Sequence, residues 1–318
     1  MDDVVFNEDE YLRANPDVAT AVKEGVFRSG REHYETYGKK EGRRLFGKDW
    51  REENILRFID KKGLGLEIGP SFNPIAPKKK GYNVHILDCV SAEELRNKYQ
   101  GHDVSIDNIE EVDFIWQGED LPKLIGKTCC YDWVIASHVI EHVPDFVSFL
   151  QQCEVLLKPD CFLFLAVPDK RYCFDYFSET TSTGQVLDAF AEKRMRPAPG
   201  QIFDHVANFS KRKGKTTWLS DGQGGADELM NSMSQAEALW ERSVSSKEYI
   251  DVHCWRFTPA SFRLIISDLL YLGLTSMEIK EEFDTKNCEF FVVLGKKIDA
   301  LLEFDRLDML RKKKFEND

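Results

Sequence analysis

Hydrophobic and polar positions follow two different periods along the chain from about residue 50 onward. Short apolar runs bounded by polar residues predict five strands, at residues 64–69, 82–88, 112–117, 131–137 and 161–168. Residues 49–61 and 143–158 have a helical period instead, and Pro159 ends the second of these helices. Strands that alternate with helices imply right-handed crossovers, a parallel sheet and a ligand site at the carboxyl ends of the strands.

This alternation breaks between residues 170 and 255, a stretch that is too long for an ordinary loop and therefore predicts an insertion. Residues 259–273 predict a helix that begins at Thr258-Pro259, and residues 275–284 and 288–297 predict two more strands. The turn between these strands is so short that they must be antiparallel. The sequence thus predicts an α/β fold: a Rossmann-like, seven-stranded, mostly parallel sheet with a closing antiparallel hairpin and a long insertion after strand 5.

Residues 1–48 have a pattern of their own, with aromatic and apolar residues at helical spacing and glycines between them. They predict a small helical N-terminal module. The main domain is expected to span residues 49–298, with the insertion at about residues 170–255. Residues 299–318 predict a C-terminal helix or tail.

The 318 residues carry a net charge of -12, which disfavours a nucleic-acid partner because such binding depends on Lys and Arg displacing counterions. The amino-terminal MDDVVFNEDE lacks the basic and apolar regions of a signal peptide, and no run approaches 18 apolar residues. We therefore expect a cytoplasmic protein without a membrane span. The eight cysteines form no CxxC pair, so we expect neither disulfides nor a zinc site.

The first predicted strand runs into the loop LEIGPSFNP, which lacks the G-x-G-x-x-G pattern of a dinucleotide site. An NAD-linked oxidoreductase is therefore disfavoured. A cofactor without phosphates would still need close backbone approach at Gly69 and an acidic residue for its hydroxyls. Asp88 ends the second strand 19 residues after Gly69, which is about the spacing at which a carboxylate reaches a ribose diol.

Four segments in order resemble the motif series of class I S-adenosylmethionine-dependent methyltransferases: LEIGPSFNP, LD at residue 88, YDWVIASHVIEHVPD and LKPDCFLFLAVPD. The resemblance covers residues 60–170, and residues 256–297 match the closing helix and antiparallel hairpin of that family. It implies that the cofactor is S-adenosyl-L-methionine.

The resemblance also implies which residues hold this cofactor. They are Glu67 and Gly69 at its methionine end, Asp88 at its ribose, Glu119, Asp120 and Leu121 at its adenine, and Ser137 and His138 beneath its sulfonium. The chain departs from the family at Pro70-Ser71-Phe72, where a second glycine is usual, so Ser71 or Asn73 is expected to add a hydrogen bond. His142 matches a structural position of the family and is not assigned to catalysis.

Residues 11–18 (YLRANPDV) and 33–43 (HYETYGKKEGR) resemble a short module of bacterial proteins of surface-polysaccharide synthesis, where it often sits beside glycosyltransferase domains. This resemblance implies a glycan or other small-molecule acceptor, and glycosyltransferases of the same pathway as partners. The alternative is a helical cap that merely packs on the main domain.

Methyl transfer to a hydroxyl needs a base that removes the proton of the hydroxyl. The insertion offers Asp204-His205 and Asp251-His253, because a histidine beside a carboxylate is a suitable base near neutral pH. We favour His205 with Asp204, and His253 as partner or substitute; surface or structural histidines are the alternative. The same residues are suitable ligands for a divalent metal, but their spacing is not diagnostic and no metal is assigned.

The resulting hypothesis is an S-adenosylmethionine-dependent O-methyltransferase of a sugar or glycan in bacterial surface-polysaccharide synthesis. Aromatic residues of the insertion would wall the acceptor pocket, although such residues more often form a core: Tyr172, Phe174, Tyr176, Phe177, Trp240 and Trp255. Alternatives are methylation of another small molecule and a non-catalytic scaffold with this fold in a polysaccharide assembly complex. Protein or RNA methylation stays open, because such motifs report the cofactor rather than the acceptor. The oligomeric state cannot be predicted from the sequence.

Overall fold

The computed structural model describes residues 6, 8–41, 43, 55–102, 104–216, 224–297 and 305–317. Contacts within the chain divide it into two units, Met1–Asp60 and Lys61–Asp318. The helix predicted at residues 49–61 lies mostly outside the described residues.

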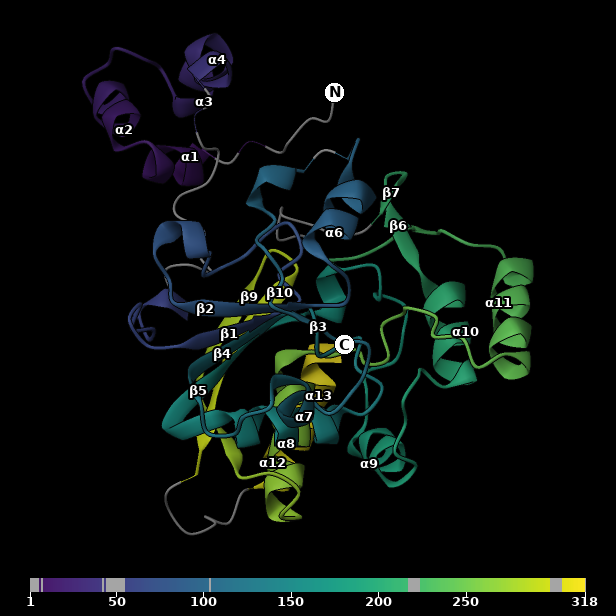
Figure 1. Cartoon of the computed structure of the whole chain (residues 1–318). Helices are drawn as coiled ribbons and strands as arrows, with labels where there is room; N and C mark the ends of the chain where they lie inside the picture. Colours follow the sequence, from purple (N-terminus) through teal and green to yellow (C-terminus); the bar gives the residue numbers. More distant parts are fainter. Residues whose placement is uncertain are drawn as a thin grey trace. The chain divides into compact units, whose positions relative to one another are not determined.

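The first unit consists of short helices joined by tight turns (Figure 1). They are α1 (Glu8–Ala14), α2 (Pro16–Lys23), α3 (Gly30–His33), the π-helical turn η1 (Tyr34–Gly38) and α4 (Lys39–Glu41). Ser29 caps α3, because its side chain accepts a hydrogen bond from the backbone N–H of Glu32.

The residues of the pattern YLRANPDV and HYETYGKKEGR contact one another inside this unit. Tyr11 is fully buried, and its hydroxyl lies 2.8 Å from Nδ1 of His33. Gly38 packs against the same hydroxyl, so that a Cβ at residue 38 would collide with it. At the surface, Arg43 donates a hydrogen bond of 2.9 Å to Asp17. The pattern therefore specifies the packing of a small helical unit.

The second unit is built on a seven-stranded sheet with the order β3-β2-β1-β4-β5-β10-β9. Its strands are β1 (Gly65–Ile68), β2 (Val84–Asp88), β3 (Phe114–Ile115), β4 (Tyr131–Ser137), β5 (Leu157–Pro168), β9 (Met277–Lys286) and β10 (Glu289–Lys296). Strands β1 to β5 pair in parallel, whereas β10 pairs antiparallel with both β5 and β9. The predicted fold class, a mostly parallel seven-stranded sheet with a closing antiparallel hairpin, is confirmed.

The central strands are buried on both faces, which explains why their sequences are continuously apolar. Leu66 of β1 lies opposite Val134 of β4, and Ile68 lies opposite Ala136; none of the four is more than 1% exposed. Such burial is typical of parallel strands that helices cover on both sides. Gly65 lies against the Trp133 ring, where a side chain would not fit.

Five helices of this unit lie against or beside the sheet: α6 (Ala92–Tyr99), α7 (Leu121–Ile125), α8 (Phe146–Leu156), α12 (Pro259–Tyr271) and α13 (Arg306–Asn317). Figure 1 shows α7, α8, α12 and α13 gathered on one side of the sheet. The rings of Phe146 in α8 and Phe262 in α12 meet edge to face at 6.0 Å, and both are fully buried. Apolar contacts of this kind fix the helices on the sheet.

The insertion after β5 has its own secondary structure, which the sequence did not predict. It contains η4 (Lys170–Tyr172), α9 (Thr183–Ala191), α10 (Pro199–Asn208) and α11 (Met233–Ser245). A small antiparallel sheet, β7-β6-β8, lies between α10 and α11 in the chain, with β6 at Ser210–Arg212, β7 at Lys215–Thr216 and β8 at Glu228–Leu229. Helices α10 and α11 pack side by side (Figure 1).

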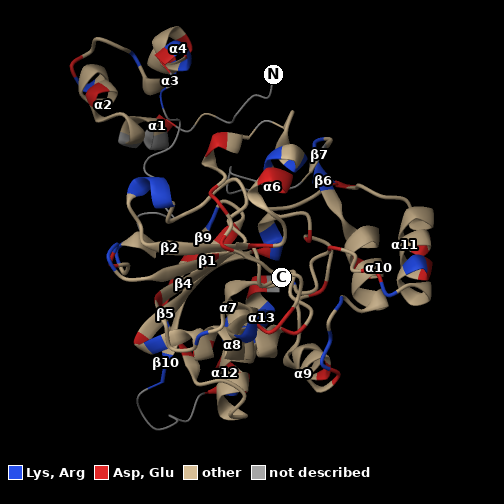
Figure 2. Cartoon of the chain, viewed as in Figure 1, with Lys and Arg blue, Asp and Glu red and all other residues tan. Residues whose placement is uncertain are grey.

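Lys and Arg are scattered among Asp and Glu over the helices and loops of each unit (Figure 2). None of the helices in the described ranges has both the length and the apolar composition that crossing a membrane requires.

Candidate functional site

Parallel pairing brings the carboxyl ends of four strands to one edge of the sheet. Strand β1 ends before Gly69, β2 ends at Asp88, β4 ends at Ser137, and β5 ends directly before Asp169. Ligands of α/β folds bind at this edge, outside the ends of the strands. Most of the predicted cofactor-binding residues lie here.

Gly69 occupies a position that only glycine suits. Its φ of +64° is in the left-handed region, and a Cβ would lie 2.8 Å from Cγ2 of Val139. The missing side chain therefore keeps a space at the end of β1 that any other residue would fill.

Asp88 ties the loops after β1 and β2 together. Its Oδ2 accepts a hydrogen bond from the backbone N–H of Ser71 at 3.0 Å, and its Oδ1 accepts one from Cys89 N–H at 2.8 Å. Each carboxylate oxygen has a further lone pair, so both can still accept from the hydroxyls of a diol. The predicted neighbour Asn73 is exposed, and its backbone N–H closes the turn onto the carbonyl of Pro70.

The hydroxyl of Ser71 lacks a partner within the described part of the chain. Its Oγ is shielded from solvent and makes no hydrogen bond. Buried hydroxyls are rarely left so, because the unpaired group costs free energy. A polar atom of a bound cofactor would satisfy it.

Glu67 holds the loop after β1 in place by hydrogen bonds to its backbone. It is 1% exposed, and its two carboxylate oxygens accept hydrogen bonds from the backbone N–H groups of Ile75 at 2.6 Å and Ala76 at 3.0 Å. Burial raises the pKa of Glu67 to about 7, although these hydrogen bonds oppose the shift. The contact of Glu67 with the methionine end of the cofactor stays a prediction.

The turn formed by Glu119, Asp120 and Leu121 begins α7. Asp120 caps the helix by accepting from the backbone N–H of Lys123 at 3.0 Å, and Leu121 is fully buried. The carboxylate of Glu119 accepts from Gln117 N–H at 2.7 Å. The three residues thus hold the turn in shape, and their contact with adenine stays a prediction.

His138 follows Ser137 at the end of β4 and has a φ of +54°. Its Nε2 lies 2.5 Å from Oε2 of Glu289, and its Nδ1 lies 3.5 Å from Oε1 of Glu141. Burial would lower the pKa of His138, but the nearby carboxylates of Glu141 and Glu289 outweigh burial and raise the pKa to about 9. A protonated imidazole therefore stands between two buried carboxylates at this edge.

These features fit S-adenosylmethionine. The cofactor needs space at Gly69, hydrogen-bond acceptors for a ribose diol and no cradle for phosphates. The structure has a glycine whose Cβ would meet Val139, a carboxylate at Asp88 with lone pairs to spare, and the buried hydroxyl of Ser71. When bound, the cofactor would supply an activated methyl group.

The two histidines of the insertion lie together, but His253 has the closer carboxylate. Nδ1 of His253 lies 2.6 Å from Oδ2 of Asp175, and both side chains are buried. Nδ1 of His205 lies 4.0 Å from Asp175 and accepts a hydrogen bond from the backbone N–H of His253 at 3.3 Å. Burial lowers the pKa of His205 to about 3, so His205 is neutral at pH 7.

Asp204 is not paired with His205. It is exposed and lines an open groove of about 360 Å³ together with Gly200, Phe203 and Trp240 of α10 and α11. Neighbouring residues of a helix point about 100° apart, so Asp204 faces the groove while His205 faces Asp175. The groove contains no residue of the strand ends.

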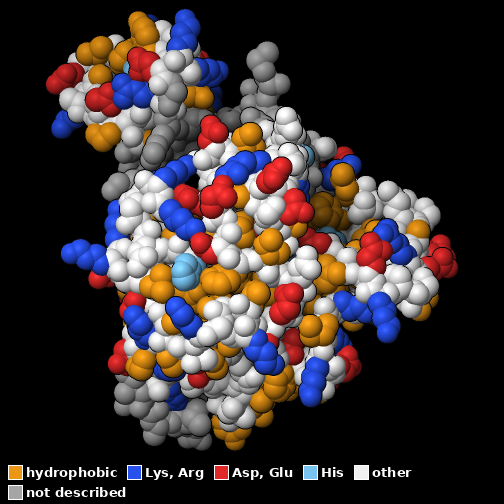
Figure 3. All heavy atoms as spheres, viewed as in Figure 1, with side chains coloured by type: hydrophobic (Ala, Val, Ile, Leu, Met, Phe, Trp, Pro, Cys, Tyr) orange, Lys and Arg blue, Asp and Glu red, His pale blue; other side chains and the backbone are white. Residues whose placement is uncertain are grey.

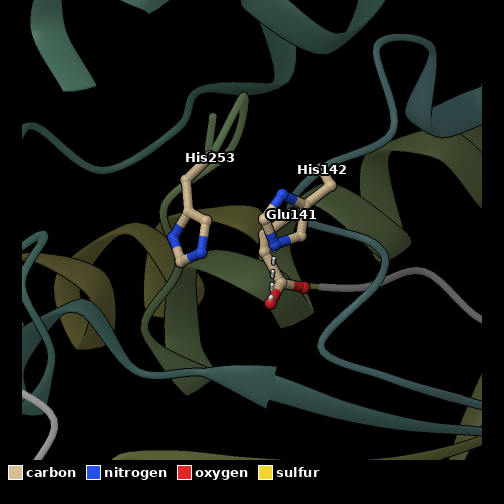
Figure 4. A group of neighbouring side chains, drawn as sticks. All are labelled: Glu141, His142 and His253. Atoms are coloured by element: carbon tan, nitrogen blue, oxygen red, sulfur yellow. Dashed lines mark ion pairs between the residues drawn. The ribbon is translucent and has the colours of Figure 1, made fainter. Parts of the chain in front are cut away.

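Asp251 is not paired with His253 either. Its Oδ1 lies 2.8 Å from Nδ1 of His142, so the four residues considered as metal ligands do not converge. Within the described residues, the ligand atoms that converge belong to Glu141, His142 and His253 (Figure 4).

The aromatic residues of the insertion divide into core and surface. Trp255 belongs to the main core, and Phe174 stacks on Phe209 at 4.3 Å. Trp240 is 43% exposed, and Phe177 is also exposed. Figure 3 shows hydrophobic side chains at the surface beside the α10–α11 pair.

Three residues of the site could not be recognised in the sequence: Asp175, Glu141 and Arg256. Arg256, directly after the insertion, has its Nε 3.5 Å from Asp175, which places an opposite charge beside this buried carboxylate. The signal for Asp175 is a single acidic residue among the aromatic residues of RYCFDYF. Glu141 directly precedes His142, whose motif position indicates a structural role.

Comparison with known proteins gives the family. Residues 43–240, more than half of the chain, match the methyltransferase domain family. No curated protein matches the sequence.

Three solved structures show how far the similarity extends. One, named as a Zn-dependent alcohol dehydrogenase from Rhodobacter sphaeroides, is 11% identical, covers 79% of this chain and 91% of that chain, and has a TM-score of 0.43. A methyltransferase from Methanosarcina mazei is 14% identical over 77% of this chain and 98% of that chain, with a TM-score of 0.40. An S-adenosylmethionine-dependent methyltransferase from Listeria monocytogenes is 10% identical over 79% and 100%, with a TM-score of 0.39.

The family match therefore carries the assignment, since all three TM-scores are below 0.5. It confirms the predicted enzyme class and the predicted cofactor, and it agrees with a strand edge whose residues fit that cofactor. The chain belongs to the methyltransferase domain family and is an S-adenosylmethionine-dependent methyltransferase.

Proposed function

We propose that the protein transfers the methyl group of S-adenosylmethionine to a hydroxyl of a sugar or glycan in bacterial surface-polysaccharide synthesis. The observation that carries this proposal is the buried pair of His253 and Asp175 in the insertion that follows the cofactor edge. Methylation of oxygen requires loss of a proton, whereas an uncharged amine needs no such help. A histidine oriented by a buried carboxylate suits an oxygen acceptor.

The cofactor edge positions the methyl donor. Gly69 leaves space for the backbone to approach the cofactor, Asp88 accepts from the ribose hydroxyls, and Ser71 completes the loop contacts. The reaction is an in-line displacement, so most of the acceleration comes from holding the acceptor oxygen opposite the leaving sulfur.

Hydrogen bonding favours His253 over His205 as the group that faces the acceptor. Nδ1 of His205 accepts the N–H of His253, so the proton of a neutral His205 lies on Nε2 and no lone pair is left for a substrate. Asp175 holds Nδ1 of His253, which leaves the lone pair of Nε2 available on the opposite side of the ring. His205 is then a positioning residue that fixes the backbone of His253.

The groove on α10 and α11 supports a sugar acceptor. Trp240 offers an exposed aromatic face, and Asp204 offers carboxylate oxygens that accept hydrogen bonds from hydroxyls. A glycan could extend from the reaction centre along this groove. A small molecule other than a sugar is the second candidate, because nothing in these contacts requires a sugar ring.

The first unit links the proposal to its pathway only through its resemblance to modules that accompany glycosyltransferases. Its patterned residues, such as Tyr11 and His33, are engaged in packing the unit. Glycosyltransferases of the same pathway are the partners that we propose.

The test begins with calorimetric titration by S-adenosylhomocysteine, with NAD as the control ligand. Asp88→Ala is expected to weaken binding 10-fold to 100-fold, because hydrogen bonds to a charged group contribute about 1.5–3 kcal/mol. Asp107→Ala, an exposed carboxylate outside the strand edge, should leave binding unchanged. Unchanged affinity of Asp88→Ala would refute the ribose contact.

The acceptor is then sought with radiolabelled S-adenosylmethionine and a panel of nucleotide sugars and oligosaccharides. His253→Ala should lower turnover at least 100-fold without changing S-adenosylhomocysteine affinity. His205→Ala should have a smaller effect. Labelling of amines or proteins but not of sugars would contradict the proposal.

A further inference from the structure

We propose that Glu141, His142 and His253 form a binding site for a divalent transition-metal ion that activates the acceptor hydroxyl. The activating role rests on the proposed function, whereas the metal site itself does not. The three residues are 112 positions apart at most, and the insertion brings His253 back to the loop after β4.

The ligand atoms already converge. One atom from each residue lies within 4.8 Å of the others, and Nε2 of His142 is 4.0 Å from Oε1 of Glu141. Figure 4 shows the two imidazoles on either side of a common space, with the carboxylate of Glu141 below His142. Tetrahedral bonds of about 2.0–2.2 Å to a metal place the ligand atoms roughly 3.3–3.6 Å apart, so side-chain shifts that shorten these separations by up to about 1.5 Å complete the site.

Both histidines are oriented for a metal by carboxylates. Asp251 lies 2.8 Å from Nδ1 of His142, and Asp175 lies 2.6 Å from Nδ1 of His253. These contacts fix the tautomer in which Nδ1 carries the proton and the lone pair is on Nε2. A carboxylate behind a histidine ligand is the usual arrangement at protein metal sites, where it also makes the imidazole a better donor.

The surroundings of the Glu141 carboxylate are a second, independent indication of a cation. Its side chain is 1% exposed, and neither carboxylate oxygen has a hydrogen bond of normal geometry within the described residues. Its nearest imidazole nitrogens, those of His138 and His142, are 3.5 and 4.0 Å away. A buried carboxylate without hydrogen bonds is costly, and a metal ion would satisfy it.

The donor set selects the kind of ion. Two imidazoles and one carboxylate suit Zn²⁺, Mn²⁺, Fe²⁺ or Co²⁺ better than Mg²⁺ or Ca²⁺, which prefer oxygen ligands alone. Three protein ligands leave at least one position open for another oxygen. His142 is 32% exposed, so this ligand borders the solvent.

The open position would take the acceptor hydroxyl. With the ion bound, Nε2 of His253 is a ligand and no longer takes the proton itself. The metal-bound hydroxyl would instead lose its proton to water at neutral pH, because a metal ion lowers the pKa of a bound O–H group. The oxygen lone pair then forms the bond to the methyl carbon. The carbon–sulfur bond breaks, and its electron pair stays on the sulfur of S-adenosylhomocysteine.

The test is metal binding by the full chain, without affinity tag, cofactor or acceptor. Co²⁺ is added to chelator-treated protein while its visible absorption is followed, and Zn²⁺ is titrated calorimetrically. We expect one tight equivalent of either ion. Glu141→Gln and His253→Gln should each weaken binding at least 100-fold, whereas His102→Gln, an exposed histidine elsewhere, should bind as the parent does.

Asp251→Asn is a second variant that should fold normally, because Asp251 is 70% exposed. Asp251 contacts the metal ligand His142 at Nδ1, on the side of the ring away from the metal. The substitution should weaken metal binding 10-fold to 100-fold. Near-ultraviolet circular dichroism and S-adenosylhomocysteine affinity of each variant confirm that the fold is intact.

The outcomes separate this proposal from the proposed function. Failure to bind one equivalent, or equal binding by folded Glu141→Gln, His253→Gln and Asp251→Asn variants, would overturn the metal site even if S-adenosylhomocysteine binds. One equivalent that depends on these residues would establish the site even if no sugar is methylated.

Discussion

Nδ1 of His253 lies 2.6 Å from Oδ2 of Asp175, and neither side chain is more than 4% exposed. Arg256 approaches the other oxygen of Asp175 to 3.5 Å. Burial by itself would raise the pKa of Asp175, but the hydrogen-bonded imidazole of His253 and the charge of Arg256 outweigh burial and hold this pKa well below its usual range. The carboxylate therefore stabilises the insertion in its ionised form.

We expect Asp175→Asn to lower the free energy of unfolding by about 3 kcal/mol at pH 7, because it leaves Arg256 buried without a counter-charge. A depressed pKa contributes stability above the ordinary value near 3.8, and this contribution is lost as the pH falls. The difference between parent and variant should thus narrow below about pH 4. Urea unfolding of both proteins at about pH 7, 5 and 3.5 measures this difference in stability. A difference that does not change with pH would contradict the lowered pKa of Asp175.

Gly69 and Gly81 form a matched pair for testing the cofactor loop. Both have positive φ, of +64° and +86°, but a Cβ meets Val139 at residue 69 and nothing within 4 Å at residue 81. Alanine at either position should cost about 1 kcal/mol of backbone strain. Gly69→Ala should lose roughly a further 1–3 kcal/mol to the contact and bind S-adenosylhomocysteine at least 10-fold more weakly. Equal stability and equal affinity of the two variants would remove Gly69 from the site.

Glu67 is expected to lower the stability of the protein as the pH rises, which is the opposite of the effect of Asp175. The pKa of Glu67 is about 7 in the folded protein, whereas a free glutamate side chain has a pKa of 4.5. The unfolded chain therefore loses this proton at lower pH, and ionisation of Glu67 reduces stability as the pH rises from about 4.5 to 7. The shift corresponds to about 3 kcal/mol.

The comparison with Glu67→Gln isolates this effect, because the other titrating groups are the same in both proteins. The stability of the variant relative to the parent should increase by about 3 kcal/mol between about pH 4.5 and pH 7.5. The variant is expected to be the less stable protein at the acidic end. Its amide oxygen can replace only one of the two carboxylate oxygens that accept from Ile75 N–H and Ala76 N–H, because the amide nitrogen is a donor and cannot accept. Chemical denaturation across this range is the measurement, and a constant offset would show that Glu67 stays ionised.

Trp240 predicts how the acceptor is bound. Trp240→Ala should raise the KM for a sugar acceptor about tenfold, equivalent to about 1.4 kcal/mol, with little change in kcat. Asp204→Asn should act in the same direction. Met233→Ala is the control, because Met233 is 65% exposed on the same helix but does not line the groove. A change in kcat with an unaltered KM would place Trp240 outside acceptor binding.

The sheet could be predicted from the sequence because its strands are buried on both faces. Continuous apolar runs such as those of β4 and β5 are bounded by polar residues, and the short turn at Asn287 allows only an antiparallel hairpin. The small sheet of the insertion could not be predicted. Its strands are two or three residues long, and β8 is exposed, so no hydrophobic period marks them.

The pairing of charged groups could not be predicted for a different reason. Proximity in sequence suggested the pairs Asp204–His205 and Asp251–His253. In the structure Asp204 faces the groove of α10 and α11, and Asp251 is paired with His142. His253 is paired with Asp175, which is 78 residues away. Local spacing carries no information on such contacts, because the path of the insertion decides them.

The main-chain carbonyl of Glu141 accepts hydrogen bonds from both Cys254 N–H, at 2.7 Å, and Trp255 N–H, at 3.2 Å. The indole of Trp255 also donates to the carbonyl of Val143 at 2.7 Å. The returning end of the insertion is thereby anchored on the loop after β4, and its first end is continuous with β5. Under the proposed function, changes in residues 183–245 other than His205 could therefore alter which acceptor is recognised while the reaction centre keeps its geometry, so new substrates could evolve without rebuilding the chemistry.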